Sequence, residues 1–375
     1  MNFTKSMMLL SCGMLFTLLF VACSDDDPSV PAPTPTDNEA VYIEDEDKLA
    51  MIYSLRDLEG DKGRLYEMTY TTDYKLDEAL DFQITGVNTL KQFVFTRLFD
   101  RQTPKTKNLT LTYDAGCSAF ACPDKSTGNY LMGRNFDFGH FRPGTEERIM
   151  IPAIVVHTAP KGGKKSVSFV DGQFVGYESG FYTAENNDLS MLVALPYLLL
   201  DGINEDGFAI SVLKLDGNHT WQKDPGKKNI FTTVAMRMLL DRASTVKQAT
   251  KMLEEYNMIM DEDKASYHFM MADATGDYAI VEYTNPVVAD EVYPDSMEVL
   301  TGHDTLRYVT NFYVSPTMKY TEHGSIISDH GKARYDTLRT VLRNYQYNTT
   351  FEQGMDALTK VAQGPDSKLT TGFTQ

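Results

Sequence analysis

The chain has 375 residues and a formal net charge of −17, with 42% apolar and 11% aromatic residues. This apolar content excludes a disordered chain, and the length allows one large domain or two modest ones. The negative charge argues against DNA or RNA as a partner, because phosphate binding needs a basic patch.

Residues 1–22 predict a signal peptide. Lys5 precedes an apolar stretch, Met7 to Ala22, that is short for a membrane span. The stretch ends in Phe-Val-Ala-Cys at positions 20–23, which resembles the lipobox of bacterial lipoproteins. The resemblance implies that Cys23 is lipidated and becomes the mature N-terminus. Ordinary signal cleavage that leaves Cys23 unmodified is the alternative.

Residues 23–39 are acidic and rich in proline, which predicts a solvated linker. A linker of this kind after a lipidated cysteine resembles surface lipoproteins of Bacteroidota. The resemblance implies a protein anchored by lipid to the outer membrane, on its periplasmic or outer face. The membrane is then a partner through the N-terminal lipid.

We expect residues 117–375 to form the catalytic domain. Residues 40–116 before it are then a pro-segment or a small subunit. Apolar residues at helical spacing predict helices over 45–58 and 76–98. Strand patterns over 117–122 and 130–135 flank a segment rich in turn-forming residues. They predict a hairpin that brings Arg134 back towards the start of its first strand.

The hairpin also bears on the cysteines. Cys117 and Cys122 are five positions apart on the first strand, so their side chains should point to opposite faces. We therefore expect no disulfide between them.

The remaining chain alternates between strand and helix patterns. Predicted strands cover 208–213, 268–272, 278–283 and 307–314. Predicted helices cover 231–241, 244–255 with Ser244 as N-cap, 332–344 and 352–361. This order of antiparallel hairpins and helices indicates an α+β fold.

Common catalytic signatures are absent: G-x-S-x-G, the P-loop, H-E-x-x-H and C-x-x-C. The seven histidines are scattered, so we expect no metal site. The informative segment is Gly116-Cys117-Ser118, followed by Gly-Arg-Asn-Phe-Asp-Phe at positions 133–138. It resembles the start of the mature catalytic subunit in the choloylglycine hydrolase and penicillin V acylase family. Acid ceramidase and N-acylethanolamine acid amidase are relatives of that family.

The resemblance implies a four-layer αββα sandwich of the N-terminal nucleophile hydrolase type, with no metal or organic cofactor. A cysteine at a free N-terminus carries its own base, because an α-amino group has a pKa of about 7.7–8. Arg134 would favour the thiolate, and the Asp137 carboxylate would orient the α-ammonium group. These roles require a cut between Gly116 and Cys117. The alternative is a core cysteine beside a structural Arg134–Asp137 ion pair.

Three later positions complete the resemblance. Asn204, in the Asp-Gly-Ile-Asn-Glu-Asp-Gly segment, and Asn311, in Tyr-Val-Thr-Asn, match asparagines of the oxyanion hole. Such donors stabilise the tetrahedral oxyanion of amide hydrolysis. Arg334 matches an arginine that lines the site. The alternatives are a turn former at Asn204 and a solvated helical side chain at Arg334.

Two features depart from the short bile salt hydrolases. About 93 residues separate Cys23 from Cys117, as in the acid ceramidase-like relatives, whose leader stays bound as a smaller subunit. The W-S-x-x-Y strand usual in the family does not follow residues 371–375, which leaves two alternatives: the sequence is a fragment, or its last strands are missing.

The resemblance implies hydrolysis of a small amphipathic N-acyl amide through a thioester at Cys117. Conjugated bile acids, N-acyl amino acids or amines, and penicillin V-like amides all fit this description. Two alternatives stay open: an acyltransferase on the same scaffold, and a non-catalytic surface lipoprotein that binds a ligand. Whether the chain forms a homo-oligomer is open as well.

Overall fold

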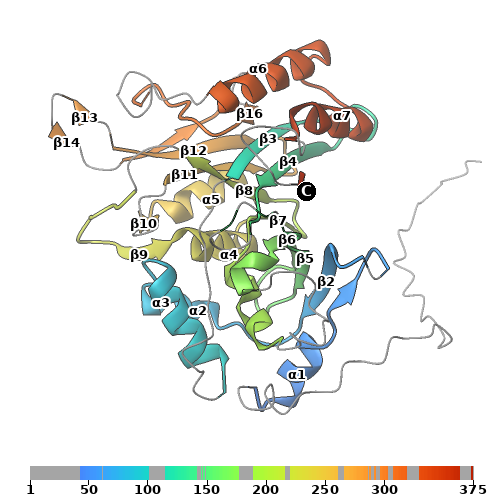
Figure 1. Ribbon diagram of the computed structural model, residues 1–375. Helices are drawn as coiled ribbons and strands as arrows, with labels where there is room; N and C mark the ends of the chain where they lie inside the picture. The colour runs from blue at the N-terminus through green and yellow to red at the C-terminus, as the bar shows by residue number, and fades with distance from the viewer. Residues whose placement is uncertain are drawn as a thin grey trace, which may run out of the picture. The chain divides into compact units, whose positions relative to one another are not determined.

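The computed structural model describes residues 43–60, 62–100, 115–141, 145, 147, 149–176, 189–215, 220–260, 266–285, 287–288, 291–292, 296–302, 307–318, 329–363 and 373–374. These residues belong to one compact unit, residues 35–375 (Figure 1). The predicted signal peptide, linker and lipidated Cys23 lie outside the described residues. No helix among those described is long and apolar enough to cross a membrane.

A nine-stranded sheet has the order β1-β2-β5-β6-β7-β8-β11-β12-β15. All neighbours are antiparallel except β2 and β5, which run parallel. The strands are β1 Arg56–Asp57, β2 Leu65–Tyr70, β5 Ala153–Thr158, β6 Ser166–Asp171, β7 Asp201–Asn204, β8 Ala209–Leu215, β11 Ser266–Ala272, β12 Tyr278–Thr284 and β15 Ser296–Leu300. Every residue of β11 and β12 is buried, as expected for a sheet covered on both faces.

A second sheet has the order β16-β3-β4-β17. It is built on the predicted hairpin, β3 Ala115–Pro123 and β4 Tyr130–Phe138, in which Ala119 lies opposite Arg134. β16 spans only Tyr308–Val309, so the prediction of a strand over 307–314 was too long. β17, Phe373–Thr374, pairs with the end of β4.

The two sheets pack against each other through β3, which contacts β8 and β11. α6 (Asp329–Asn344) and α7 (Phe351–Val361) cover the smaller sheet (Figure 1). α4 (Thr232–Arg242) and α5 (Val246–Leu253) pack on the larger one. This is the predicted αββα order of layers.

Smaller elements complete the described unit. Two short strand pairs are β9 Lys228–Phe231 with β10 Tyr256–Ile259, and β13 Val287–Val288 with β14 Glu291–Val292. Two 3-10 helices span Gly172–Val175 and Ser190–Tyr197. Thr245, not Ser244, caps α5; the Ser244 hydroxyl bonds to Asp206 instead.

The N-terminal segment is broken more often than its apolar spacing predicted. The first helix, α1, covers Glu46–Ile52 and gives way to β1. The second predicted helix divides into α2 Leu76–Phe82, α3 Val87–Phe93 and a π-helix, Val94–Leu98. Gln83 ends α2 because it adopts a left-handed conformation, with φ of 54°.

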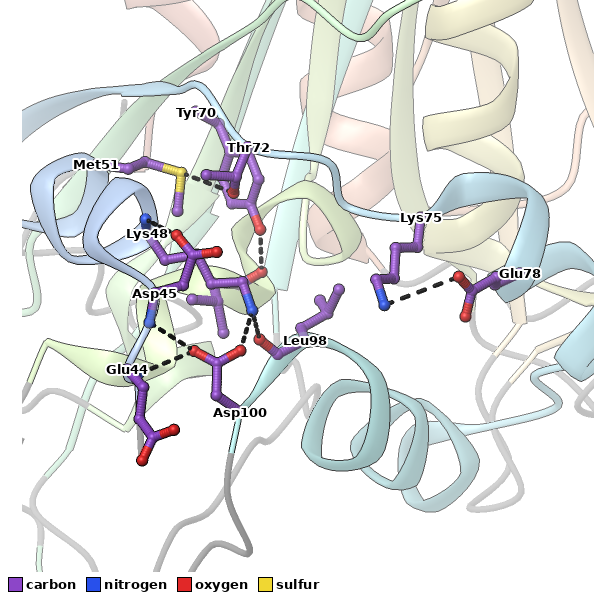
Figure 2. A network of polar contacts seen from close by, with 11 residues as sticks. Glu44, Asp45, Lys48, Met51, Tyr70, Thr72, Lys75, Glu78, Leu98 and Asp100 are labelled. Carbon is purple, nitrogen blue, oxygen red and sulfur yellow. Dashed lines mark hydrogen bonds and ion pairs between the residues drawn. The ribbon is translucent and has the colours of Figure 1, made fainter. Parts of the chain in front are cut away.

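Polar contacts tie the two ends of this segment together (Figure 2). The Asp100 carboxylate accepts hydrogen bonds from the backbone N–H groups of Glu44 and Asp45. Lys48 donates to the carbonyl of Leu98 and pairs with Asp100 at 2.5 Å. The segment also joins the rest of the unit, because β2 lies within the nine-stranded sheet and the Tyr70 hydroxyl donates to the carbonyl of Val193.

Candidate active site

Cys117 lies on β3 between the two sheets and is only 2% exposed. Along β3 the side chains alternate: Cys117, Ala119 and Ala121 belong to the main core, whereas Phe120 and Cys122 pack with α6 and α7. Both cysteines are without a disulfide. The predicted opposite orientation of the two thiols is confirmed.

Arg134 comes to the Cys117 thiol from the neighbouring strand, β4. Its Nη2 lies 3.7 Å from Sγ and donates to the carbonyl of Val212 at 3.0 Å. Nη1 pairs with Asp201 at 3.1 Å, and the guanidinium group stacks over the Phe136 ring. These contacts fix a positive charge beside the sulfur.

Asn311 contacts the backbone of the same cysteine. Its Oδ1 accepts hydrogen bonds from the Cys117 N–H at 2.6 Å and from Arg334 at 2.6 Å. Its Nδ2 donates to the carbonyl of Lys214 at 2.9 Å. Arg334, near the start of α6, also donates to the carbonyl of Cys117 and to the Ser118 hydroxyl. Asn311 and Arg334 therefore hold both peptide groups of Cys117.

Asp137 is fully buried on β4 and faces Gly116 across the hairpin. Its Oδ1 accepts a long hydrogen bond, 3.4 Å, from the backbone N–H of Gln363. The structure thus gathers five of the six predicted catalytic residues around the Gly116–Cys117 peptide: Cys117, Arg134, Asp137, Asn311 and Arg334.

Burial raises the pKa of the Cys117 thiol above its ordinary value, and this effect outweighs the others. Arg134 and Arg334 oppose it by favouring the thiolate, as does a hydrogen bond from the Lys214 backbone, whereas Asp137 adds to it. Burial likewise lowers the pKa of Arg334. With the Gly116–Cys117 peptide intact, the site therefore favours a neutral thiol.

A buried histidine–glutamate pair holds the segment that carries Asn311. His268 bonds to the carbonyl of Thr310 at 2.7 Å and to Glu282 at 3.0 Å. Glu282 accepts from the backbone N–H groups of Val314 and Ser315, both at 2.9 Å. Side chains thus satisfy the backbone on both sides of Asn311, which is why the strand predicted over 307–314 ends at Val309.

The prediction that places Asn204 in the oxyanion hole is wrong. Its Nδ2 donates to the carbonyls of Leu240 and Ala243 at the end of α4. Its Oδ1 accepts from the backbone N–H groups of Asp206 and Phe208. The side-chain amide closes a turn and caps the end of a helix. Both of its polar atoms are therefore engaged in hydrogen bonds to the backbone.

Sequence reasoning missed three residues that the structure brings to the site: Asp201, Lys214 and Gln363. Asp201 belongs to the same motif as Asn204 but was given no role. The sequence carries a signal for Lys214, because it is the one charged residue of β8. Gln363 follows α7 in a stretch without any catalytic motif.

A groove of about 550 Å³ leads to the outer side of Arg134 and Asp201. Most of its wall is apolar and comes from β4, β6, β7 and β8, including Met132, Phe169 and Ile210. Cys117 lies on the other side of Arg134, in a space of only about 10 Å³ that it shares with Val212 and Lys214. Arg134 lines both spaces.

Comparisons with known proteins found both similar solved structures and a family. Solved structures detected as similar include two variants of the conjugated bile acid hydrolase from Clostridium perfringens. The first is 14% identical, covers 69% of this chain and 83% of the other, and has a TM-score of 0.41. The second is 13% identical, covers 72% and 78%, and has a TM-score of 0.36. The penicillin V acylase from Agrobacterium tumefaciens is 14% identical, covers 71% and 72%, and has a TM-score of 0.35.

No curated protein gives a significant match to the chain. A family model does: that of the linear amide C–N hydrolases, choloylglycine hydrolase family, which matches residues 117–334, more than half of the chain. The match begins at Cys117 and ends at Arg334, the two ends of the hydrogen-bonded cluster described above. The chain therefore belongs to the choloylglycine hydrolase family of linear amide C–N hydrolases.

Proposed function

We propose that the protein is a cysteine amidohydrolase that activates itself by cutting the Gly116–Cys117 peptide bond. The observation that carries the proposal is the 2.6 Å hydrogen bond from the Cys117 N–H to Asn311. After cleavage this nitrogen becomes the α-amino group, so the base that the thiol needs is already held beside it.

Self-cleavage proceeds in two steps, an acyl shift from nitrogen to sulfur and hydrolysis of the resulting thioester. Cys117 Sγ attacks the carbonyl carbon of Gly116, the C–N bond breaks, and the Cys117 nitrogen takes up the thiol proton. Water then attacks the thioester, the C–S bond breaks, and Gly116 leaves as a carboxylate.

Turnover of substrate repeats this chemistry on a linear amide. The thiolate, favoured by Arg134, attacks the amide carbonyl to form a thioester, and the α-ammonium group protonates the departing amine. Hydrolysis of the thioester releases the acid. The apolar groove that leads to Arg134 supports a substrate with an apolar acyl part, such as a conjugated bile acid, an N-acyl amino acid or amine, or a penicillin V-like amide.

We further propose that residues 40–116 stay bound after cleavage as a smaller subunit. β2 is an inner strand of the nine-stranded sheet, and Leu90 and Phe93 are fully buried in the main core. Hydrogen bonds also join this segment to the rest of the chain. The Tyr74 hydroxyl donates to Asp241, and the Tyr197 hydroxyl donates to the carbonyl of Tyr74. Separation of the segment would expose this apolar surface to water.

Intact-mass measurement of the purified protein tests the cleavage. We expect two fragments that meet at Gly116/Cys117 under denaturing conditions and one assembly under native conditions. Cys117→Ala should leave the chain whole and inactive. A wild-type chain that stays whole and hydrolyses nothing would contradict the proposal.

A panel of conjugated bile salts, N-acyl amino acids and penicillin V, assayed by product mass, tests the substrate class. Assays with and without an added acceptor amine separate hydrolysis from acyl transfer. Membrane attachment through Cys23 is part of the proposal, and loss of fatty acid labelling in Cys23→Ser tests it.

A further inference from the structure

The side chain of Gln363 packs on the glycine of the proposed cleavage site. A Cβ atom built on Gly116 would overlap Nε2 of Gln363 and lie only 2.9 Å from its Cδ. Position 116 therefore has no room for a side chain while Gln363 keeps its place. This contact gives a physical reason for glycine at the residue whose carbonyl would be attacked.

Gln363 is held in this position from two directions. Its backbone N–H donates to Asp137, the residue opposite Gly116 in the β3–β4 hairpin. It comes two residues after the end of α7, which is tied to β4 because Asn135 donates to the carbonyl of Leu358 at 2.8 Å. These contacts place the backbone of Gln363 beside the end of β4.

The Gln363 amide is also buried without a hydrogen bond. The residue is 4% exposed, and within the described part of the chain neither Nε2 nor Oε1 has a partner. A buried amide without a partner destabilises a folded protein, so such groups are rare and call for an explanation. An apolar side chain of the same size would fill the space without this cost.

We propose that Gln363 belongs to the self-cleavage site: it fixes Gly116 by contact and donates its side-chain N–H to the oxygen of Gly116 that gains negative charge. That oxygen becomes an oxyanion when Cys117 Sγ bonds to the carbonyl carbon. It carries charge again in the carboxylate that leaves after hydrolysis. The amide thus finds its partner only during the reaction, which is where a donor lowers the barrier. The inference rests on the self-cleavage proposed above.

The first test compares Gln363→Met with the wild type in a time course of intact mass after translation in vitro. Methionine has a similar size and no amide, so we expect self-cleavage to slow at least 10-fold while the melting temperature stays equal or rises. A purely structural glutamine would not slow cleavage without loss of stability. Cleavage of the methionine variant at the wild-type rate would overturn the proposal.

The second test uses the steric contact. Gly116→Ala should slow self-cleavage strongly when Gln363 is present and only slightly in the Gln363→Ala background, where the space for a methyl group returns. An equal slowing by Gly116→Ala in both backgrounds would show that the contact does not govern position 116. A wild-type chain that never cleaves would instead contradict the proposed function itself.

Discussion

Asn311 and Asn204 are the same residue type, and the family resemblance predicted both for the oxyanion hole, yet they lie in different surroundings. Asn311 bonds to the backbone of Cys117 and to Arg334. Among the described residues, the Asn204 side chain bonds to backbone groups of its own turn and of the chain at the end of α4. The difference teaches that long-range contacts, and not the local motif, decide where an amide is placed: Asn311 lies at the Cys117 peptide and Asn204 at a turn.

Replacement of Asn311 should have the largest effect. In Asn311→Ala the nitrogen of Cys117 loses the acceptor that holds it, so we expect kcat for amide hydrolysis to fall by roughly 100-fold or more. Self-cleavage should slow as well. Steady-state kinetics on the fully cleaved fraction, with the melting temperature as control, measures the effect. Activity within twofold of the wild type would remove Asn311 from the site.

The matched variant Asn204→Ala should reverse the pattern. It removes the hydrogen-bond partner of two buried carbonyls and of the buried N–H of Phe208, which should lower the free energy of unfolding by about 1–3 kcal/mol. The kcat of folded enzyme should stay within about twofold of the wild type. Denaturant unfolding and active-site titration give the two quantities, and a large loss of kcat at unchanged stability would restore Asn204 as a site residue.

The His268–Glu282 pair sharpens the comparison, because it acts on Asn311 only through the backbone. In the wild type the N–H groups of Val314 and Ser315 bond to different oxygens of Glu282. Glu282→Gln keeps only one acceptor oxygen, so one of these two N–H groups loses its hydrogen bond. We expect kcat to fall by about 10-fold with little change in KM, since the groove is built from other elements. A change confined to KM would contradict this positioning role.

The smallest expected effect concerns the thiol itself. In the uncleaved chain burial raises the pKa of Cys117, and Arg134 opposes the rise. Arg134→Gln removes the opposing charge, so the pKa should rise further and the pH profile of alkylation should move to higher pH. Mass spectrometry can follow alkylation of Cys117 in the whole-chain species alone. A shift to lower pH would mean that Arg134 does not favour the thiolate.

The local sequence pattern was sufficient to predict the β3–β4 hairpin and the orientation of the residues on it. The alternation of β3 predicted the opposite orientation of Cys117 and Cys122, and the turn between the strands set Arg134 next to the thiol. Strand register depends on neighbours in the chain and on a period of two, both of which can be read from sequence.

The same reasoning placed helix ends poorly. The apolar spacing over 76–98 continues without interruption, but Gln83 turns the chain in a left-handed conformation and divides the predicted helix. The strand predicted over 307–314 ended early because His268 and Glu282, from two other strands, take up its backbone groups. In the strand, tertiary contacts overrode local preference.

The sequence by itself determined the α+β class and the hairpin, because these follow from short-range pattern. The family resemblance of its motifs implied the αββα layers and the grouping of Cys117, Arg134 and Asp137. Only the tertiary structure decided between Asn311 and Asn204 and brought Lys214 and Gln363 to the nucleophile. Asn311 is 194 positions from Cys117 along the chain, and Gln363 is 226 positions from Asp137. Contacts over such separations depend on how the layers pack, which no local pattern encodes.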